Sequence, residues 1–140
     1  MFLFPVTVND AEFLYALLKE RPPEANISHH EMPTFEEHVR FIESNPYEAW
    51  YTIEALTGSP GFEAPRKIGA LYLTRRDEIG VHILSEHRGR GYGRPAVQML
   101  MERHPRERYL ANISPLNETS QRMFRSLGFN LIQWTYERRA

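Results

Sequence analysis

The chain has no cysteine among its 140 residues. It therefore offers no disulfide framework, no thiolate nucleophile and no thiolate ligand for a metal. Histidine could still bind a metal, and His29 and His30 form the one adjacent pair among six histidines. Neither a His-x-x-x-His spacing nor a carboxylate cluster with metal-ligand spacing accompanies that pair. We expect no metal site.

Long apolar runs and an excess of one charge are missing as well. No segment approaches the ~20 apolar residues that a membrane helix requires, and the amino-terminal MFLFPVTVND lacks the basic region of a signal peptide. We therefore expect a cytoplasmic protein with no membrane partner. Lysine and arginine number 17 and aspartate and glutamate 18, a net charge of −1. This balance argues against a generic nucleic-acid binder.

The remaining composition is that of an ordinary globular domain. Hydrophobic residues make up 41% of the chain and charged residues 25%, so disorder is not expected. The length fits one domain, which we assign to residues 1–140. Charge is uneven along the chain, because residues 86–108 contain six arginines and only three glutamates. This basic region coincides with the most informative motif.

Residues 79–93 form that motif, an apolar, β-branched run that leads into three glycines at alternating positions, 89, 91 and 93. Residues 94–104 then carry apolar side chains at helical spacing, so the unit is a strand, a turn and a helix. A helix start has unpaired backbone N–H groups, and glycine lets an anion approach them closely. The pattern predicts a site for a phosphate-bearing ligand. The alternative is an ordinary turn before a helix.

Two common nucleotide motifs fit this turn poorly. A dinucleotide fingerprint starting at Gly89 needs glycine or alanine at position 94, where arginine stands. The Gly-Lys-Ser/Thr triplet of a nucleoside-triphosphate loop does not occur in the chain.

The arginines of residues 86–108 divide into two sets. We expect Arg88, Arg90 and Arg94 to lie beside the phosphate, and Arg103, Arg106 and Arg108 to lie on a solvated helix face.

The pattern Arg88-x-x-Gly91-x-Gly93 resembles the acetyl-CoA-binding segment of the GNAT superfamily of N-acetyltransferases, Gln/Arg-x-x-Gly-x-Gly/Ala after a strand. A second stretch, residues 117–129, resembles the next segment of that superfamily, in which Asn-x-x-Ala/Ser opens a helix that ends in Gly-Phe. The two matches stand in the right order, about one βα unit apart. The resemblance covers roughly residues 49–129, and residues 26–44 loosely resemble members that acetylate amino-sugar nucleotides or protein amino termini.

The resemblance implies that acetyl-CoA is the cosubstrate and that the acceptor is a primary amine of a small molecule, an amino sugar or a protein N-terminus. Backbone groups of the central strand would hold the thioester and the pantetheine arm, and the turn would receive the pyrophosphate. The binding residues implied in this way are Val81, His82, Ile83, Arg88, Gly89, Arg90, Gly91, Tyr92, Gly93, Arg94, Asn117, Ser120 and Phe124. Asn117 has a second interpretation as a helix N-cap.

Direct transfer needs a group that takes a proton from the amine. Glu78 is our first candidate, because strand alternation places it on one face with Gly80 and His82. Its alternative is a surface ion pair with Arg75 or Arg76. The loop histidines His29 and His30 are rival bases.

The chain departs from the superfamily at the acid and at a second base. Many members carry a tyrosine seven residues after the asparagine that matches Asn117, and here that residue is Phe124. Asn112 stands where some members have a glutamate. Without a tyrosine there, the thiolate would leave unprotonated, or be met by water or by another donor such as Ser120 or Ser114. These departures support an alternative function, a non-catalytic CoA-binding module, and a structural or partner-binding domain is the third.

The predicted order of elements is β-α-α-β-β-β-α-β-α-β, an α+β fold with a GNAT-like, mainly antiparallel mixed sheet of about six strands. Strands are expected at residues 2–8, 49–56, 67–74, 78–84, 108–113 and 130–138, and helices at 11–20, 34–44, 94–104 and 117–127. Full superfamily members have two strands after the Gly-Phe, and here only one fits. Either the domain is trimmed or a partner chain, as in a homodimer, completes the sheet edge.

Overall fold

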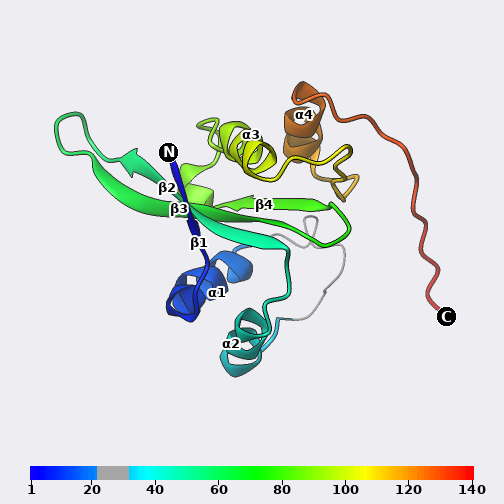
Figure 1. Ribbon diagram of the computed structural model, residues 1–140, viewed down its shortest axis with the longest axis horizontal. Coiled ribbons are helices and arrows are strands. Elements are labelled where there is room, and N and C mark those ends of the chain that lie inside the picture. Colours follow the sequence, from blue (N-terminus) through cyan, green and yellow to red (C-terminus); the bar gives the residue numbers. More distant parts are fainter. Residues whose placement is uncertain (22–31) are drawn as a thin grey trace.

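The computed structural model describes residues 1–21 and 32–140, in which a single sheet lies between two pairs of helices (Figure 1). Four antiparallel strands follow the order β1-β2-β3-β4. They are β1 (Phe2–Pro5), β2 (Ala49–Thr57), β3 (Ala64–Leu73) and β4 (Ile79–Ile83). β1 lies at the edge of the sheet. Pro5 is compatible with this position, because proline has no backbone N–H to donate to a further strand.

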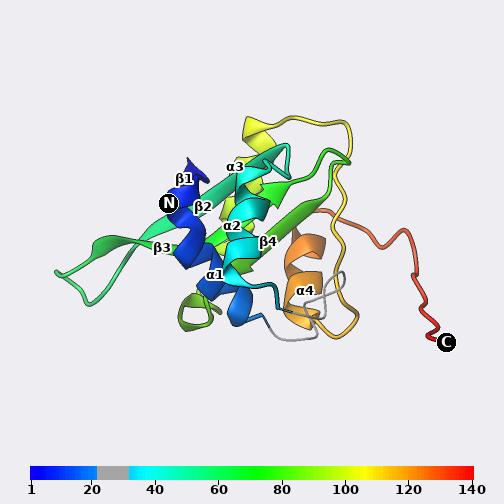
Figure 2. The same cartoon turned by 90° about the horizontal axis from the view of Figure 1, so that it is seen from below.

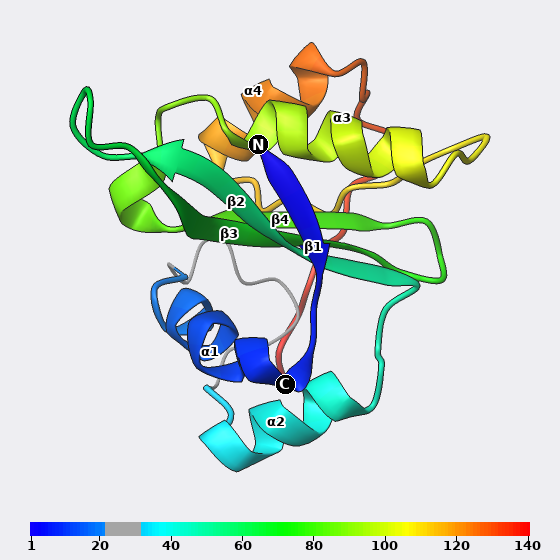
Figure 3. The same cartoon turned by 60° about the vertical axis from the view of Figure 1, so that its left-hand side comes forward.

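Two helices cover each face of the sheet, as Figures 2 and 3 show from other directions. One pair is α1 (Ala11–Lys19) and α2 (Phe35–Glu43), and the other is α3 (Gly93–Arg103) and α4 (Glu118–Ser126). Short 3₁₀ turns, η1 (Val8–Asp10) and η3 (Ser85–His87), precede α1 and the glycine turn. A capping box opens α2, in which the side chains of Thr34 and Glu37 each accept the other residue's backbone N–H.

The core has two parts because the sheet has two covered faces. On one face Ile53, Leu71 and Ile79 pack with Val97 and Leu100 of α3. On the other face Ala70 packs with apolar residues of α1 and α2, among them Leu14, Leu17 and Ile42. Alternate residues of β3 and β4 therefore point to opposite helix layers.

The prediction of six strands is wrong in its last two members. Residues 108–113 make one isolated parallel bridge, between Glu78 and Leu110, and no strand. Residues 130–138 form neither a helix nor a strand, and all of them are exposed. A strand needs a partner for its backbone groups, and within the described residues neither segment has one over its length. The other predicted strands and helices are present, with ends that differ by at most three residues.

The described helices are too short or too polar to cross a membrane.

Candidate functional site

The outer side of β4 is open beyond its first residue. The Ile79 N–H donates to the Leu110 carbonyl (2.8 Å), and the Leu110 N–H donates to the Asp77 carbonyl (2.8 Å). Because strand residues alternate, the N–H and C=O of Val81 and Ile83 point the same way as those of Ile79. No further backbone bond joins β4 to residues 111–113 in the described chain. The two segments therefore meet at one end and leave backbone groups free at the other.

Strand alternation also sorts the three predicted backbone ligands. Val81 keeps both its N–H and its C=O free of any described partner. The N–H of Ile83 has no described hydrogen-bond partner, while its carbonyl accepts the Arg88 Nε–H at 2.9 Å. His82 pairs with Ala70 of β3, so its backbone groups point away from the open side. Val81 is thus the best-placed backbone donor at this edge.

The turn after β4 presents free N–H groups at the start of α3. Gly89 and Gly91 have φ angles of +76° and +78°, the left-handed conformation that favours glycine, and a Cβ on either would lie in open space. The residue before α3, Tyr92, makes no side-chain cap, and the first turn of α3 has no acidic residue. Within the described helices this combination is unique to α3. An uncapped, positive helix end behind a glycine turn suits an anionic ligand.

The three arginines of this turn have different surroundings. Arg88 is held by the Ile83 carbonyl and lies 3.9 Å from a Glu20 carboxylate oxygen. Arg94 donates to the Ser126 carbonyl at the end of α4 (3.3 Å). Arg90 is exposed, and no hydrogen bond or ion pair joins it to a described residue. Arg90 is therefore the arginine most available to a phosphate.

Glu78 sits beside the bridge between β4 and residues 108–113, with both carboxylate oxygens bonded. One accepts the Thr74 hydroxyl at 3.2 Å, and the other accepts the Asn112 side-chain amide at 2.5 Å. The alternative ion pair with arginine is not formed, because Arg75 donates instead to the carbonyls of Asn45 and Pro46. Asn112 and Thr74 thus orient the carboxylate, a role that the sequence alone did not suggest.

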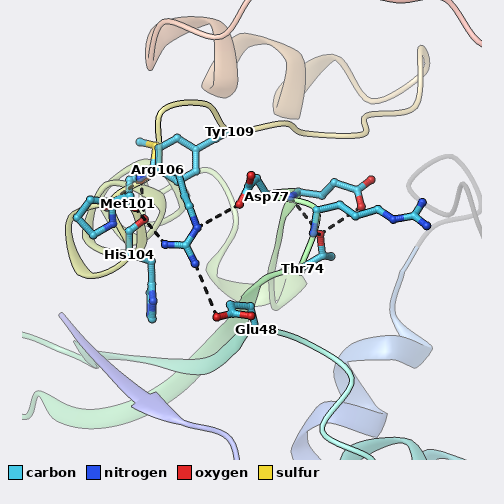
Figure 4. A network of polar contacts seen from close by, with 10 residues as sticks. Glu48, Thr74, Asp77, Met101, His104, Arg106 and Tyr109 are labelled. Carbon is cyan, nitrogen blue, oxygen red and sulfur yellow. Dashed lines mark hydrogen bonds and ion pairs between the residues drawn. The ribbon is translucent and has the colours of Figure 1, made fainter.

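A polar network fixes the loop that carries Leu110 and Asn112 to the sheet (Figure 4). Arg106 donates to Asp77 (3.1 Å) and lies 3.8 Å from a Glu48 carboxylate oxygen. The Tyr109 hydroxyl accepts the Arg106 N–H and donates to backbone carbonyls at the end of α3. Arg106 therefore does not lie on a solvated helix face. Arg103 is the last residue of α3 and is exposed, as predicted, and its guanidinium also donates to the Leu3 carbonyl (3.1 Å).

The face of β4 that carries Glu78 also carries Gly80 and His82, and Tyr72 of β3 covers it. A Cβ at Gly80 would lie 2.2 Å from the Tyr72 ring, so this position must be glycine. Tyr72 stacks on Tyr47 at 4.1 Å between ring centroids. Burial raises the pKa of both phenols, so neither is ionised at neutral pH. The spacing of Tyr47 and Tyr72 in the chain does not predict their contact, although a glycine within a strand, such as Gly80, is itself a signal of close packing.

His82 is neutral in this environment. Burial, followed by the nearby charges of Arg21 and Arg88, lowers the pKa of His82 to about 3. Its Nε2 is buried without a hydrogen-bond partner among the described residues. A neutral imidazole on the same face as Glu78 can accept a hydrogen bond, but with this pKa it does not serve as a base at neutral pH.

The start of α4 approaches the start of α3, since a Cβ at Gly93 would lie 3.7 Å from the Met123 methyl carbon. Asn117 is an N-cap, as predicted, and its side-chain oxygen accepts the Ser120 N–H (3.2 Å). Its amide nitrogen has no described partner. Phe124 is 4% exposed and packs edge-on against Phe129, so it belongs to the core.

The remaining site predictions concern Ser114 and the loop histidines. Ser114 is half-buried, and its hydroxyl accepts the Leu116 N–H (3.2 Å). His29 and His30 lie outside the described residues. Within the described part, no group of three or more histidine and carboxylate side chains is arranged to hold a metal ion.

Comparisons with known proteins agree with this architecture. Residues 1–130 match the family model of the acetyltransferase (GNAT) domain. A domain from Methanocaldococcus jannaschii DSM 2661 superposes with a TM-score of 0.82 at 23% identity, covering 97% of this chain and 92% of that one. No curated protein matches the chain.

Two further solved structures have names that state a function or a ligand. Ribosomal-protein-alanine N-acetyltransferase from Brucella melitensis has a TM-score of 0.65 at 21% identity, covering 93% of this chain and 85% of that one. The structure of yncA from Salmonella typhimurium with its cofactor acetyl-CoA has a TM-score of 0.66 at 18% identity, covering 92% and 79%. At such identities these similarities concern the fold.

Proposed function

The chain belongs to the GNAT acetyltransferase family, and from this premise we propose that it transfers the acetyl group of acetyl-CoA directly to a primary amine. The observation that carries the proposal is the open end between β4 and residues 111–113. There the free backbone of Val81, the oriented carboxylate of Glu78 and the glycine turn lie along one short stretch of chain.

The described residues fit a CoA thioester on two counts. The N–H groups of residues 89–94 have no described backbone partner and lie at an uncapped helix start, which suits a pyrophosphate. The free N–H of Val81 suits a thioester carbonyl. In our proposal Arg90 adds a charge to the pyrophosphate, and the amide nitrogen of Asn117 bonds the pantetheine arm. Bound acetyl-CoA supplies the activated acetyl group.

Glu78 is the proposed base. Its carboxylate accepts a proton from the acceptor nitrogen, directly or through one water, as that nitrogen bonds the acetyl carbon and the carbon–sulfur bond breaks. The Val81 N–H bonds the carbonyl oxygen, on which negative charge develops. Asn112 and Thr74 hold the carboxylate beside the bridge to Leu110, next to the open end. The CoA sulfur leaves as a thiolate and takes its proton from water, because Phe124 has none to give.

The acceptor class is a primary amine of a small molecule, an amino sugar or a protein N-terminus. A protein N-terminus is the substrate that the name of the Brucella relative suggests. The face lined by Tyr72, Gly80 and His82 is the proposed acceptor side, because it lies opposite the α3–α4 layer. A cytoplasmic location stays a prediction from the sequence.

A non-catalytic CoA-binding module is the second candidate, supported by the absence of a tyrosine at position 124. The structure offers a counterargument, since Asn112 holds Glu78 where a module without chemistry would not need it.

Two measurements on the same protein separate these functions. CoA at ~100 times its dissociation constant should stabilise the fold by roughly 2.7 kcal/mol in either case. Incubation with acetyl-CoA and a panel of amines and amino-terminal peptides should release free thiol only for the enzyme. Stabilisation without amine-dependent thiol would indicate the binding module, and neither effect would contradict both functions.

A further inference from the structure

One carboxylate, that of Glu20, bonds the segment between β4 and the glycine turn. Glu20 directly follows α1. One of its oxygens accepts the Ser85 N–H at 2.7 Å, and the other accepts the Ser85 hydroxyl at 3.2 Å. The first oxygen also lies 3.9 Å from the Arg88 guanidinium. Glu20 therefore contacts the first residue of η3 and the residue that follows its end.

These contacts are the polar link between the glycine turn and the rest of the domain. Every other described hydrogen bond or ion pair of residues 85–92 ends within residues 83–96. A Cβ at Gly89 or Gly91 would meet no atom within 4 Å, so the turn itself packs against nothing there. Because glycine restricts the backbone least, the position of the turn depends on how the residues before it are fixed.

The support for Glu20 is a helix anchored in the core. Leu14 and Leu17 of α1 are buried and pack with Ala70 of β3. α1 lies on one face of the sheet and α3 on the other (Figure 3), and β4 is the strand at the edge between them. Glu20 thus reaches past the end of β4 from the proposed acceptor side to the proposed acetyl-CoA side. A side chain on a packed helix holds its partner more precisely than one on a loop.

We propose that Glu20 is a positioning residue for acetyl-CoA. It holds residues 85–88 where the following N–H groups, those of residues 89–94, meet the pyrophosphate. The Ser85 bonds carry the effect, because the Arg88 contact is long and joins partly exposed groups. The inference rests on the proposed function, since it takes the glycine turn as the pyrophosphate site. Loss of these bonds weakens binding of CoA and leaves the chemistry after binding unchanged.

Two substitutions of Glu20 separate its reach from its charge. Glu20→Gln keeps the length of the side chain and an oxygen that accepts the Ser85 N–H, but it has no charge. Glu20→Asp keeps the charge and is one methylene shorter, so it does not reach Ser85 from α1. We expect Glu20→Asp and Glu20→Ala to raise the dissociation constant of CoA roughly tenfold or more, the scale of a hydrogen bond to a charged group. Glu20→Gln should stay close to the parent.

Titration calorimetry with CoA measures these affinities, and thermal unfolding checks that each variant is folded. Glu12→Ala is the matched control, because it removes an exposed carboxylate from the same helix and should leave the affinity unchanged. Hydrogen exchange without ligand reports on the turn itself. We expect faster exchange in residues 85–93 of Glu20→Asp and Glu20→Ala, and parent-like exchange in Glu20→Gln.

Steady-state kinetics distinguish positioning from a general loss of structure. In Glu20→Ala the KM for acetyl-CoA should rise, while kcat and the KM for the amine stay near the parent values. A fall in kcat with an unchanged KM for acetyl-CoA would overturn the inference.

The binding results also separate this inference from the proposed function. Equal CoA affinity in the parent and in Glu20→Ala would overturn the inference and leave the proposed function standing. A Glu20→Asp variant that binds like the parent, or a Glu20→Gln variant as weak as Glu20→Ala, would assign the effect to charge and overturn the inference as well. A parent that binds no CoA would contradict the proposed function, and this inference with it.

Discussion

At the scale of single residues, the account depends most on Glu78, whose oxygens are bonded by Thr74 and Asn112. Both bonds come from neutral donors, and no ion pair with a described residue competes for the carboxylate. A base held by neutral donors beside the bridge to Leu110, next to the open end of the sheet, is available to an incoming amine. Asn112, which replaces a second acidic residue in some relatives, is in this account a positioning residue.

Glu78→Gln keeps the shape of the side chain and removes its basicity. We expect the acetyl-transfer rate at neutral pH to fall by roughly ten- to ten-thousand-fold, the range typical of losing a general base. Glu54→Gln in β2 removes a carboxylate elsewhere in the sheet and should leave the rate unchanged. An unaltered pH–rate profile in Glu78→Gln would rule out this role.

For His82 we predict an effect on the free energy of unfolding rather than on the rate of acetyl transfer. Its pKa is about 3 in the folded chain, against an ordinary value near 6.5. Between these values the unfolded chain binds a proton that the folded chain refuses. The free energy of unfolding should therefore fall as the pH drops below about 6.5, by up to about 1.4 kcal/mol per unit from this group.

Urea denaturation of the parent and of His82→Gln at pH 7 and pH 5 measures this effect. The variant has no imidazole to protonate, so it should lose less stability over the interval. His38, whose pKa burial also lowers, remains in both proteins and cancels from the difference. Equal losses in the two proteins would show that His82 is not kept neutral by the fold.

At the scale of elements, the glycine turn and the start of α3 form one unit. We expect Gly91→Ala to weaken CoA binding at least tenfold, about 1.4 kcal/mol, because its methyl group projects into the space of the pyrophosphate. Gly61→Ala is the matched control. Gly61 has a φ of +84° and equally open surroundings, but it lies in the β2–β3 connection.

Titration calorimetry with CoA on both variants, with thermal unfolding as a check of folding, gives the comparison. Both substitutions carry the same left-handed strain, roughly 1–2 kcal/mol, so only the position differs. Equal affinity in Gly91→Ala and Gly61→Ala would place the pyrophosphate away from this turn.

Elements with local signals could be predicted from the sequence, and elements that need distant partners could not. Three local features depend only on residues close together in the chain, and all are present: the capping box at Thr34, the N-cap at Asn117 and the glycines before α3. Residues 108–113 and 130–138 have strand composition, but a strand exists only where another strand pairs with it. Contacts across the sheet, such as Asn112 with Glu78 and Tyr47 with Tyr72, leave no spacing signal in the chain.

In the whole molecule, the sheet lies between the proposed acetyl-CoA side and the proposed acceptor side. The α3–α4 layer and the turn before it provide the helix end, glycines and free backbone that suit a CoA thioester. The opposite face carries Glu78, His82 and the Tyr47–Tyr72 pair, which suit an amine. The open end between β4 and residues 111–113 is where the two sides meet. We propose that acetyl transfer takes place at this end.

A crystal structure of the protein with acetyl-CoA tests that claim most directly. The account predicts pyrophosphate oxygens on the N–H groups of residues 89–94 and the thioester carbonyl oxygen about 3 Å from the Val81 nitrogen. It also predicts that the acetyl group is reachable from Glu78 directly or through one water. Acetyl-CoA bound elsewhere, or bound at the turn with its thioester directed away from Val81 and Glu78, would contradict the account.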